Sequence, residues 1–264
     1  MIETRDVVGH DGVACAVRGA GTNGPALVFV HGVGSTAAIW DAQLRAFEDA
    51  YRCFAVELRG NGVPPEPSPS QITRAGYACD VLAVLDAYAI DRCTIIGCSL
   101  GGVVAFELWQ RDPSRIDAMA IVGSFARYPN ARSYADGVAA AVRAAGSMEI
   151  FARARAEKLG LPPERLRETV EQMACKSVSS YLAATEATWT GDYRDLLPGI
   201  SVPVLVACGE HDAIAPLALS EEIAAGIPAS ELALIADAGH VANADAPVRF
   251  NERLQTFLAR HIRS

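Results

Sequence analysis

The hydrophobic positions of this chain form short, continuously apolar runs that alternate with longer stretches of helical spacing. The runs occupy residues 26–30, 53–58, 93–97, 119–122, 204–208 and 232–235. Helical spacing occupies residues 37–50, 77–88, 100–111 and 248–260. Continuous apolar runs are typical of strands that are covered on both faces. The alternation therefore predicts an α/β fold, with a mostly parallel sheet and helices on both of its faces.

The start of the chain has a different pattern. Residues 2–9 and 13–18 are strand-like and flank a turn signal at His10, Asp11 and Gly12. Two strand-like segments joined by such a turn predict a hairpin. With this hairpin, the expected sheet has about eight strands.

The alternation is interrupted between residues 125 and 197. This stretch contains no convincing strand and is rich in Ala, Arg and Glu, and its breaks divide it into about four helices. One of them, at residues 150–159, reads as an amphipathic helix with a solvated face. We therefore expect an α/β core from residues 1–124 and 198–264, with residues 125–197 inserted as a helical cap.

Composition limits the classes of partner. The chain has 264 residues, 51% of them hydrophobic, and a formal net charge of −8. The negative charge argues against binding to nucleic acid or to anionic membranes, which leaves a small-molecule substrate as the expected partner. The chain shows neither a signal segment at its start nor an apolar run of about 18 residues, the length of a membrane helix. We expect a cytoplasmic protein, and the sequence leaves its oligomeric state open.

The cysteines indicate a reducing compartment. There are seven, an odd number, with no C-x-x-C pair. Most lie inside apolar runs, where a free cysteine behaves as a small hydrophobic residue. We expect reduced thiols and no disulfides. We also expect no metal and no cofactor.

The strongest chemical signal is the Gly-x-Ser-x-Gly sequence at residues 97–101, which follows a predicted strand and begins a predicted helix. This context can place Ser99 on a strained turn with its Oγ exposed, where the helix N-terminus favours negative charge. Ser99 is thus a candidate nucleophile. Its neighbour Cys98 is a rival, but adjacent side chains of an extended strand point to opposite sides, so Cys98 is expected to pack behind Ser99.

A nucleophilic serine needs a base, an acid to orient the base, and donors for the oxyanion. His240 follows the strand at 232–235, and Asp212 follows the strand at 204–208, with Glu210 as its competitor. His31 begins the loop after the strand at 26–30 and is expected to support that loop through hydrogen bonds. Loops at the carboxyl ends of parallel strands share one edge of the sheet, so these segments can converge.

Taken together, these segments make the chain resemble the α/β-hydrolase superfamily with a helical cap. The matching segments are residues 31–34, 57–62, 97–102, 209–212, 239–240 and 245–247. The resemblance implies that Ser99 is the nucleophile, His240 the general base and acid, and Asp212 the orienting carboxylate, in the chain order described for this fold. It also implies that the backbone N–H groups of Val33 and Leu100 form the oxyanion hole.

The resemblance also bears on the substrate. Residues 240–250 are similar to the same segment of enol-lactone hydrolases such as 3-oxoadipate enol-lactonase, which places the chain in the serine esterase and lactonase branch. Glu57 stands where the superfamily usually has Asp, and Val63-Pro64 replaces a small polar residue. Serine rather than aspartate at position 99 argues against the dehalogenase and epoxide hydrolase relatives, which use a carboxylate nucleophile.

The leading hypothesis is a cofactor-free serine hydrolase of a small ester or lactone. Alternatives on the same fold are a hydrolase of a carbon–carbon bond in a β-diketone, a non-hydrolytic receptor or biosynthetic cyclase, and, more remotely, a cofactor-free oxygenase or perhydrolase. Arg127 and Trp189 lie near the ends of the predicted cap and are candidates for substrate binding, with Arg127 suited to a substrate carboxylate. Packing of the cap is the alternative role for both.

Overall fold

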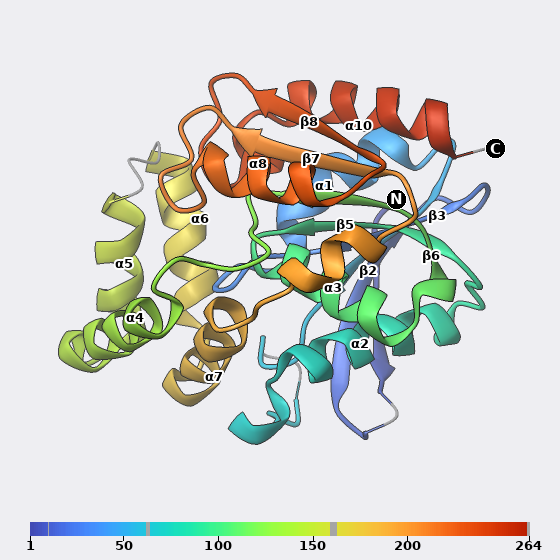
Figure 1. Cartoon of the computed structure of the whole chain (residues 1–264). Coiled ribbons are helices and arrows are strands. Elements are labelled where there is room, and N and C mark those ends of the chain that lie inside the picture. The colour runs from blue at the N-terminus through green and yellow to red at the C-terminus, as the bar shows by residue number, and fades with distance from the viewer. Residues whose placement is uncertain (10, 62–63, 159–162, 263–264) are drawn as a thin grey trace.

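The computed structural model of the chain describes residues 1–9, 11–61, 64–158 and 163–262 (Figure 1). Within these residues, eight strands form one sheet in the order β1-β2-β4-β3-β5-β6-β7-β8. The strands are β1 (Glu3–Val8), β2 (Ala14–Ala20), β3 (Ala26–Val30), β4 (Arg52–Glu57), β5 (Cys93–Cys98), β6 (Ile116–Val122), β7 (Val204–Gly209) and β8 (Ser230–Ile235). β1 and β2 pair antiparallel, as do β2 and β4, whereas every other neighbouring pair is parallel. The prediction of a mostly parallel sheet that opens with a hairpin is confirmed; His10 of the predicted turn lies outside the described residues.

Helices cover both faces of the sheet because strand side chains alternate between them. On β3, for example, Val28 belongs to one hydrophobic cluster and Phe29 to the other. The first cluster also contains residues of α2 (Arg74–Ala87), α3 (Leu100–Arg111) and α8 (Leu217–Gly226). The second contains residues of η1 (Ala37–Trp40), α1 (Asp41–Phe47), α9 (Ala242–Asp245) and α10 (Pro247–His261). Sequence analysis did not predict α8, whose buried positions include the polar Ser220 beside Ile223.

Four α-helices of the described residues lie between β6 and β7 in the chain: α4 (Ala131–Ala145), α5 (Met148–Lys158), α6 (Pro163–Ala174) and α7 (Val178–Trp189). They share a small hydrophobic cluster of their own, which includes Val142, Phe151 and Tyr181. In Figure 1 they lie at the end of the sheet toward which the arrowheads of β7 and β8 point. This is the edge where the carboxyl ends of the parallel strands meet. The division into a core of 1–124 and 198–264 and a cap of 125–197 stays a prediction.

Helix α5 departs from the amphipathic pattern expected for residues 150–159, of which residue 159 lies outside the described residues. Ile150 is 60% exposed, although it is apolar. Phe151, Ala152 and Ala156 are buried, and the half-buried Arg155 lies on the same face, four residues after Phe151. The charged residues of this helix are therefore not confined to a solvated face, as the sequence pattern had indicated.

The thiols are free, as predicted. All seven cysteines lie in the described residues, five of them are buried, and Cys175 is exposed. Among the described helices, none combines the length and apolar character needed to cross a membrane. The expected cytoplasmic location stays a prediction.

A buried ion pair ties the loop after β4 to α2. The side chains of Arg59 and Asp80 are 1% and 0% exposed, and Arg59 Nη2 donates to Asp80 Oδ1 at 2.7 Å. Asp80 Oδ2 accepts the Arg59 backbone N–H at 3.0 Å. The second partner of the guanidinium, Asp11, is 38% exposed. Because Asp80 is fully enclosed, it is the partner on which the burial of the Arg59 charge depends.

We therefore expect Asp80→Ala to destabilise the fold by about 3–5 kcal/mol, because it leaves a buried guanidinium without its enclosed partner. Asp11→Ala is the matched control, and its more exposed ion pair should cost about 1 kcal/mol or less. Urea unfolding followed by circular dichroism measures both changes. Equal losses in the two variants would contradict the assignment of the main stabilising contact to Asp80.

Candidate active site

Ser99 lies at the turn between β5 and α3, in a backbone conformation that serine rarely adopts. Its φ is +54° and its ψ is −113°. Its backbone is held on both sides: the Ser99 N–H donates to the carbonyl of Val122 at 2.9 Å, and Ser124 Oγ donates to the Ser99 carbonyl at 2.8 Å. Strain of this kind persists only where the surroundings enforce it, and it is common at functional sites. The sequence pattern had predicted this strained strand-to-helix turn.

Two glycines allow α3 to pack closely against the sheet. A Cβ at Gly97 would lie 2.2 Å from the Gly101 backbone, and a Cβ at Gly101 would lie 2.1 Å from the carbonyl oxygen of Val30. Any larger residue would push the helix away from β5 and β3. The turn that holds Ser99 therefore requires glycine at both positions.

Cys98 does not face the site. Its side chain is buried in the hydrophobic cluster on the opposite face of the sheet. Burial, reinforced by the charges of Asp212 and Asp245, raises the pKa of its thiol far above the usual value. Since the thiolate is the reactive form, Cys98 is not a competing nucleophile.

Asp212 and His240 come together, although they are 28 residues apart in the chain. His240 Nδ1 lies 2.9 and 3.0 Å from the two carboxylate oxygens of the buried Asp212. Asp212 Oδ1 also accepts the backbone N–H groups of Ile214 and Ala215, at 2.9 and 2.8 Å. These bonds hold the carboxylate in place as an acceptor, so that His240 donates from Nδ1 and keeps Nε2 for another partner.

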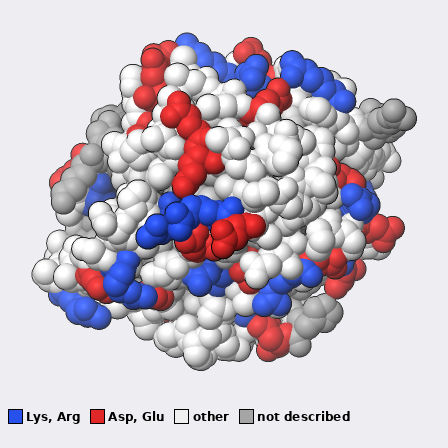
Figure 2. Space-filling view, viewed as in Figure 1, with Lys and Arg blue, Asp and Glu red and all other residues white. Residues whose placement is uncertain are grey.

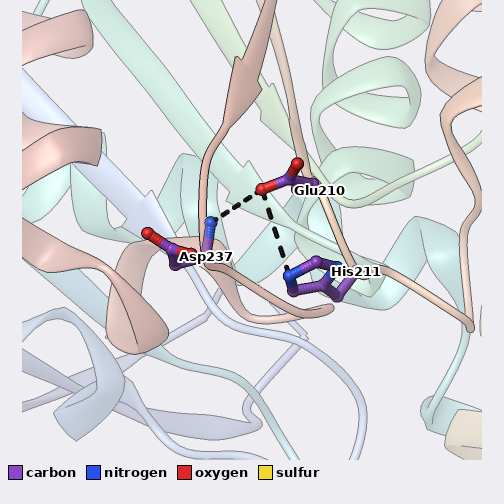
Figure 3. Close-up of side chains that lie close together, drawn as sticks. All are labelled: Glu210, His211 and Asp237. Carbon is purple, nitrogen blue, oxygen red and sulfur yellow. Dashed lines mark hydrogen bonds and ion pairs between the residues drawn. The ribbon is translucent and has the colours of Figure 1, made fainter.

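Glu210, the competing acid, points elsewhere. It is exposed, and its Oε2 accepts the backbone N–H of Asp237 at 3.1 Å and lies 4.0 Å from His211 Nε2 (Figure 3). Ligand atoms of Glu210, His211 and Asp237 lie within 4.8 Å of one another, a spacing that could hold a metal ion. However, Asp237 already pairs with Arg249 at 2.5 Å, and all three members of the cluster are exposed. The cluster carries no assignment.

Glycines also mark where the separate segments meet. A Cβ on Gly123, at the end of β6, would lie 3.1 Å from Asp212 Oδ2 and 3.4 Å from His240 Nδ1. A Cβ on Gly32 would lie 3.2 Å from the Cβ of Ser99. Gly123 itself adjoins Val122, whose carbonyl accepts the Ser99 N–H. The loops after β3, β5, β6, β7 and β8 thus converge at one edge of the sheet, as parallel strands dictate.

The backbone N–H groups of Val33 and Leu100, the expected oxyanion donors, belong to residues that line one small pocket beside Ser99. Within the described residues, neither N–H donates to another protein group. His31 supports the loop: its Nε2 accepts the Leu58 N–H at 3.2 Å, and its Nδ1 lies 2.9 Å from the Gly32 carbonyl. The oxyanion-hole assignment of Val33 and Leu100 stays a prediction.

Lys176, between α6 and α7, enters this same pocket and was not identified from the sequence. It is only 6% exposed, and its Nζ donates to Asn61 Oδ1, while Asn61 Nδ2 lies 2.8 Å from His31 Nε2. Burial lowers the pKa of Lys176, and the charge of Glu57 opposes this shift. No sequence pattern marked Lys176, because it lies in a short connection between helices. Gly62 and Val63 of the neighbouring loop lie outside the described residues.

The two candidates for substrate binding near the cap differ in burial. Trp189 is buried, stacked on Phe125 at a ring distance of 5.2 Å, and in contact with Tyr128 and Tyr134. Arg127 is exposed and lies 3.9 Å from Asp192. Arg127 does not line the pocket beside Ser99. Trp189 packs at the junction of cap and core, whereas Arg127 faces solvent, and the substrate-binding role of both residues stays a prediction.

The surface seen in Figure 2 carries acidic and basic side chains interspersed among neutral ones, without a large area of one sign. The formal net charge is −8. The expected partner, a small molecule rather than nucleic acid or membrane, stays a prediction.

Comparisons with known proteins show the fold family to which the chain is similar. A family model described as alpha/beta hydrolase fold matches residues 25–247. The chain is 29% identical over 243 residues to 3-oxoadipate enol-lactonase 2 of Acinetobacter baylyi, covering 89% of each chain. It is 30% identical over 251 residues to a putative carbamate hydrolase RutD of Variovorax paradoxus, covering 90% of this chain and 93% of that protein. The structure of a thermophilic esterase from Thermogutta terrifontis is similar, with a TM-score of 0.86 and 26% identity over 98% of this chain and 99% of that one.

Proposed function

Because the chain belongs to the α/β-hydrolase fold family, we propose that it hydrolyses a small carboxylic ester or lactone through Ser99, His240 and Asp212. The protein is an enzyme of the ester and lactone hydrolase class, as the names of its relatives indicate. The observation that carries the assignment of residues is the hydrogen bond of Asp212 to His240 Nδ1, at the edge of the sheet where Ser99 holds its strained turn.

In the proposed reaction, His240 Nε2 takes the proton of the Ser99 hydroxyl as Oγ attacks the carbonyl carbon of the substrate. The negative charge of Asp212 stabilises the imidazolium that forms. The new C–O bond to Ser99 gives a tetrahedral oxyanion, which the Val33 and Leu100 N–H groups stabilise. Donors of this kind are worth about 10²–10³ in rate each.

The second half of the reaction uses the same groups. His240 returns the proton to the departing alkoxide as the ester bond breaks, leaving an acyl group on Ser99. A water molecule, deprotonated by His240, then attacks the acyl carbon, and the acid product leaves as Ser99 regains its proton. With a lactone, the alcohol and acid products are the two ends of one molecule. No cofactor takes part in these steps.

A fluorophosphonate probe tests the proposal. We expect a covalent phosphonyl adduct on the peptide that contains Ser99, located by mass spectrometry, together with turnover of aryl esters or lactones by the same preparation. Prior heat denaturation, as a control, should abolish the labelling. Absence of any adduct on folded protein would favour a receptor or a cyclase, and would contradict the proposal.

A panel of substrates separates ester and lactone hydrolysis from the alternative reactions on this fold. It contains aryl esters, γ-lactones, an aryl carbamate and a vinylogous β-diketone. Preferred turnover of the esters and lactones supports the proposed bond type. Preferred turnover of the diketone would instead indicate carbon–carbon bond cleavage by the same residues.

A further inference from the structure

A cavity with a volume of about 1140 Å³ lies between the cap and the loop after β7. Its walls are mostly apolar or aromatic and include Tyr128, Tyr134, Val138, Phe151 and Ala213. Arg155 is the one charged residue among the described residues that line it. A large apolar cavity with a few convergent polar groups is the usual form of a small-molecule site.

Arg155 occupies a position in α5 where an apolar residue would be expected. It shares its helix face with the buried Phe151, Ala152 and Ala156. Half-buried arginine at such a position normally has a carboxylate partner, because an unpaired buried charge is costly. Among the acidic side chains that the structure describes, which leave out that of Glu164, no oxygen lies within ion-pair distance of Arg155; its neighbours are instead the phenol groups of Tyr128, Tyr134 and Tyr181.

Two exposed arginines of the cap helices differ in this respect. Arg153, two residues away on α5, is exposed and lies 3.9 Å from Glu149. Arg132 on α4 pairs with Glu186 at 2.5 Å. The described part of the cap thus supplies carboxylate partners to these two exposed arginines and none to the arginine that lines the cavity. The missing counter-ion at Arg155 points to a ligand that brings its own.

Two of the three tyrosines connect Arg155 to the candidate active site. Tyr128 interacts electrostatically with both Arg155 and Asp212, and its hydroxyl donates to the Ile214 carbonyl at 3.1 Å. Tyr181 interacts with Arg155 and lines the pocket that Val33 and Leu100 also line. The tyrosines around Arg155 therefore reach both the acid loop, at Ile214, and the pocket of the oxyanion loop.

We propose that Arg155 binds a carboxylate of the substrate, so that the enzyme acts on esters or lactones that carry a carboxylate away from the reacting carbonyl. This rests on the proposed function. A guanidinium matches a carboxylate through two parallel N–H donors, and the hydroxyl of Tyr134, which lines the same cavity, can donate a further hydrogen bond to it. One guanidinium balances one negative charge, which favours a carboxylate over a dianionic phosphate.

The test compares two substrates that differ only in charge: phenyl acetate with a 4-carboxymethyl group, and the same ester with the corresponding carboxamide. We expect kcat/KM of the wild-type enzyme to favour the carboxylate by about 10- to 100-fold, the range of a hydrogen-bonded charge pair. Arg155→Met should bring the ratio close to 1, mainly through KM, and leave the carboxamide ester little changed. Arg153→Met is the matched control and should keep the wild-type ratio.

Two results would overturn the proposal. One is a wild-type ratio near 1. The other is an equal loss for both esters in Arg155→Met, which is the result that a purely structural role predicts.

Failure of the proposed function gives a different result, namely no turnover of either ester by folded wild-type protein. Calorimetric titration with 4-hydroxyphenylacetate then decides the carboxylate site independently of catalysis. Binding that weakens at least about tenfold in Arg155→Met supports the site. Absent binding, or equal binding by the two proteins, rejects it.

Discussion

Ser99→Ala is expected to lower kcat/KM for ester hydrolysis by about 10⁴- to 10⁶-fold, the range found when the nucleophile of a serine hydrolase is removed. The physical reason is that alanine offers no oxygen for attack, so the acyl-enzyme cannot form. The residue's φ of +54° is equally accessible to serine and alanine, so the fold should persist. Steady-state kinetics with an aryl acetate measures the loss, and circular dichroism confirms the fold.

Cys98→Ala is the matched control for this variant. Its thiol is enclosed behind the turn and is not expected to react. Activity should stay within a few-fold of the wild type, at the cost of a small cavity. If instead Cys98→Ala loses activity while Ser99→Ala keeps a substantial part of it, the nucleophile assignment is wrong.

Asp212→Asn is expected to lower kcat by about 10⁴-fold without changing the shape of the site. The carboxylate accepts a hydrogen bond from His240 Nδ1 and two more from backbone N–H groups. An asparagine satisfies the backbone donors with its oxygen and then presents its NH₂ group to Nδ1. The imidazole would carry its proton on Nε2, where it could not accept the proton of Ser99.

Glu210→Gln tests the competing acid with the same chemical change. Its carboxylate is exposed and contacts Asp237 and His211 rather than His240 (Figure 3). Its kcat should remain within about threefold of the wild type, because surface contacts of this kind contribute little. A large loss of kcat in Glu210→Gln, together with near-normal kcat in Asp212→Asn, would show that Glu210 rather than Asp212 orients His240.

The predictable parts of the fold were those with a local signal. The strands β3 and β5 were predicted from continuous apolar runs, and the strand-to-helix turn at Ser99 was predicted from its two flanking glycines. Helix α8 was missed because its buried positions include Ser220, so the sequence lacks a regular apolar stripe there. The packing of the strand carboxyl ends onto one edge followed from parallel topology, and that was enough to suggest that Asp212 and His240 meet.

The candidate site was predictable only where residues sit at strand ends. Lys176 was missed because a short connection between helices carries no periodicity, and nothing local shows that its side chain turns inward to Asn61. Arg155 was missed for a related reason: an Arg in an Ala-Arg-Glu pattern normally faces water. Arg127, which the sequence offered as a candidate for a substrate carboxylate beside a packing role, is exposed beside Asp192.

By itself, then, the sequence determined the α/β architecture and the chemical types at the strand ends, because backbone periodicity and glycine geometry are local properties. The tertiary structure decided which acid contacts His240, which thiols are buried, and which cap arginine lines a cavity without a carboxylate partner among the described side chains. Those outcomes depend on how the cap helices pack over the sheet. Such packing depends on many weak contacts between residues far apart in the chain. It therefore cannot be predicted from the pattern of any short segment.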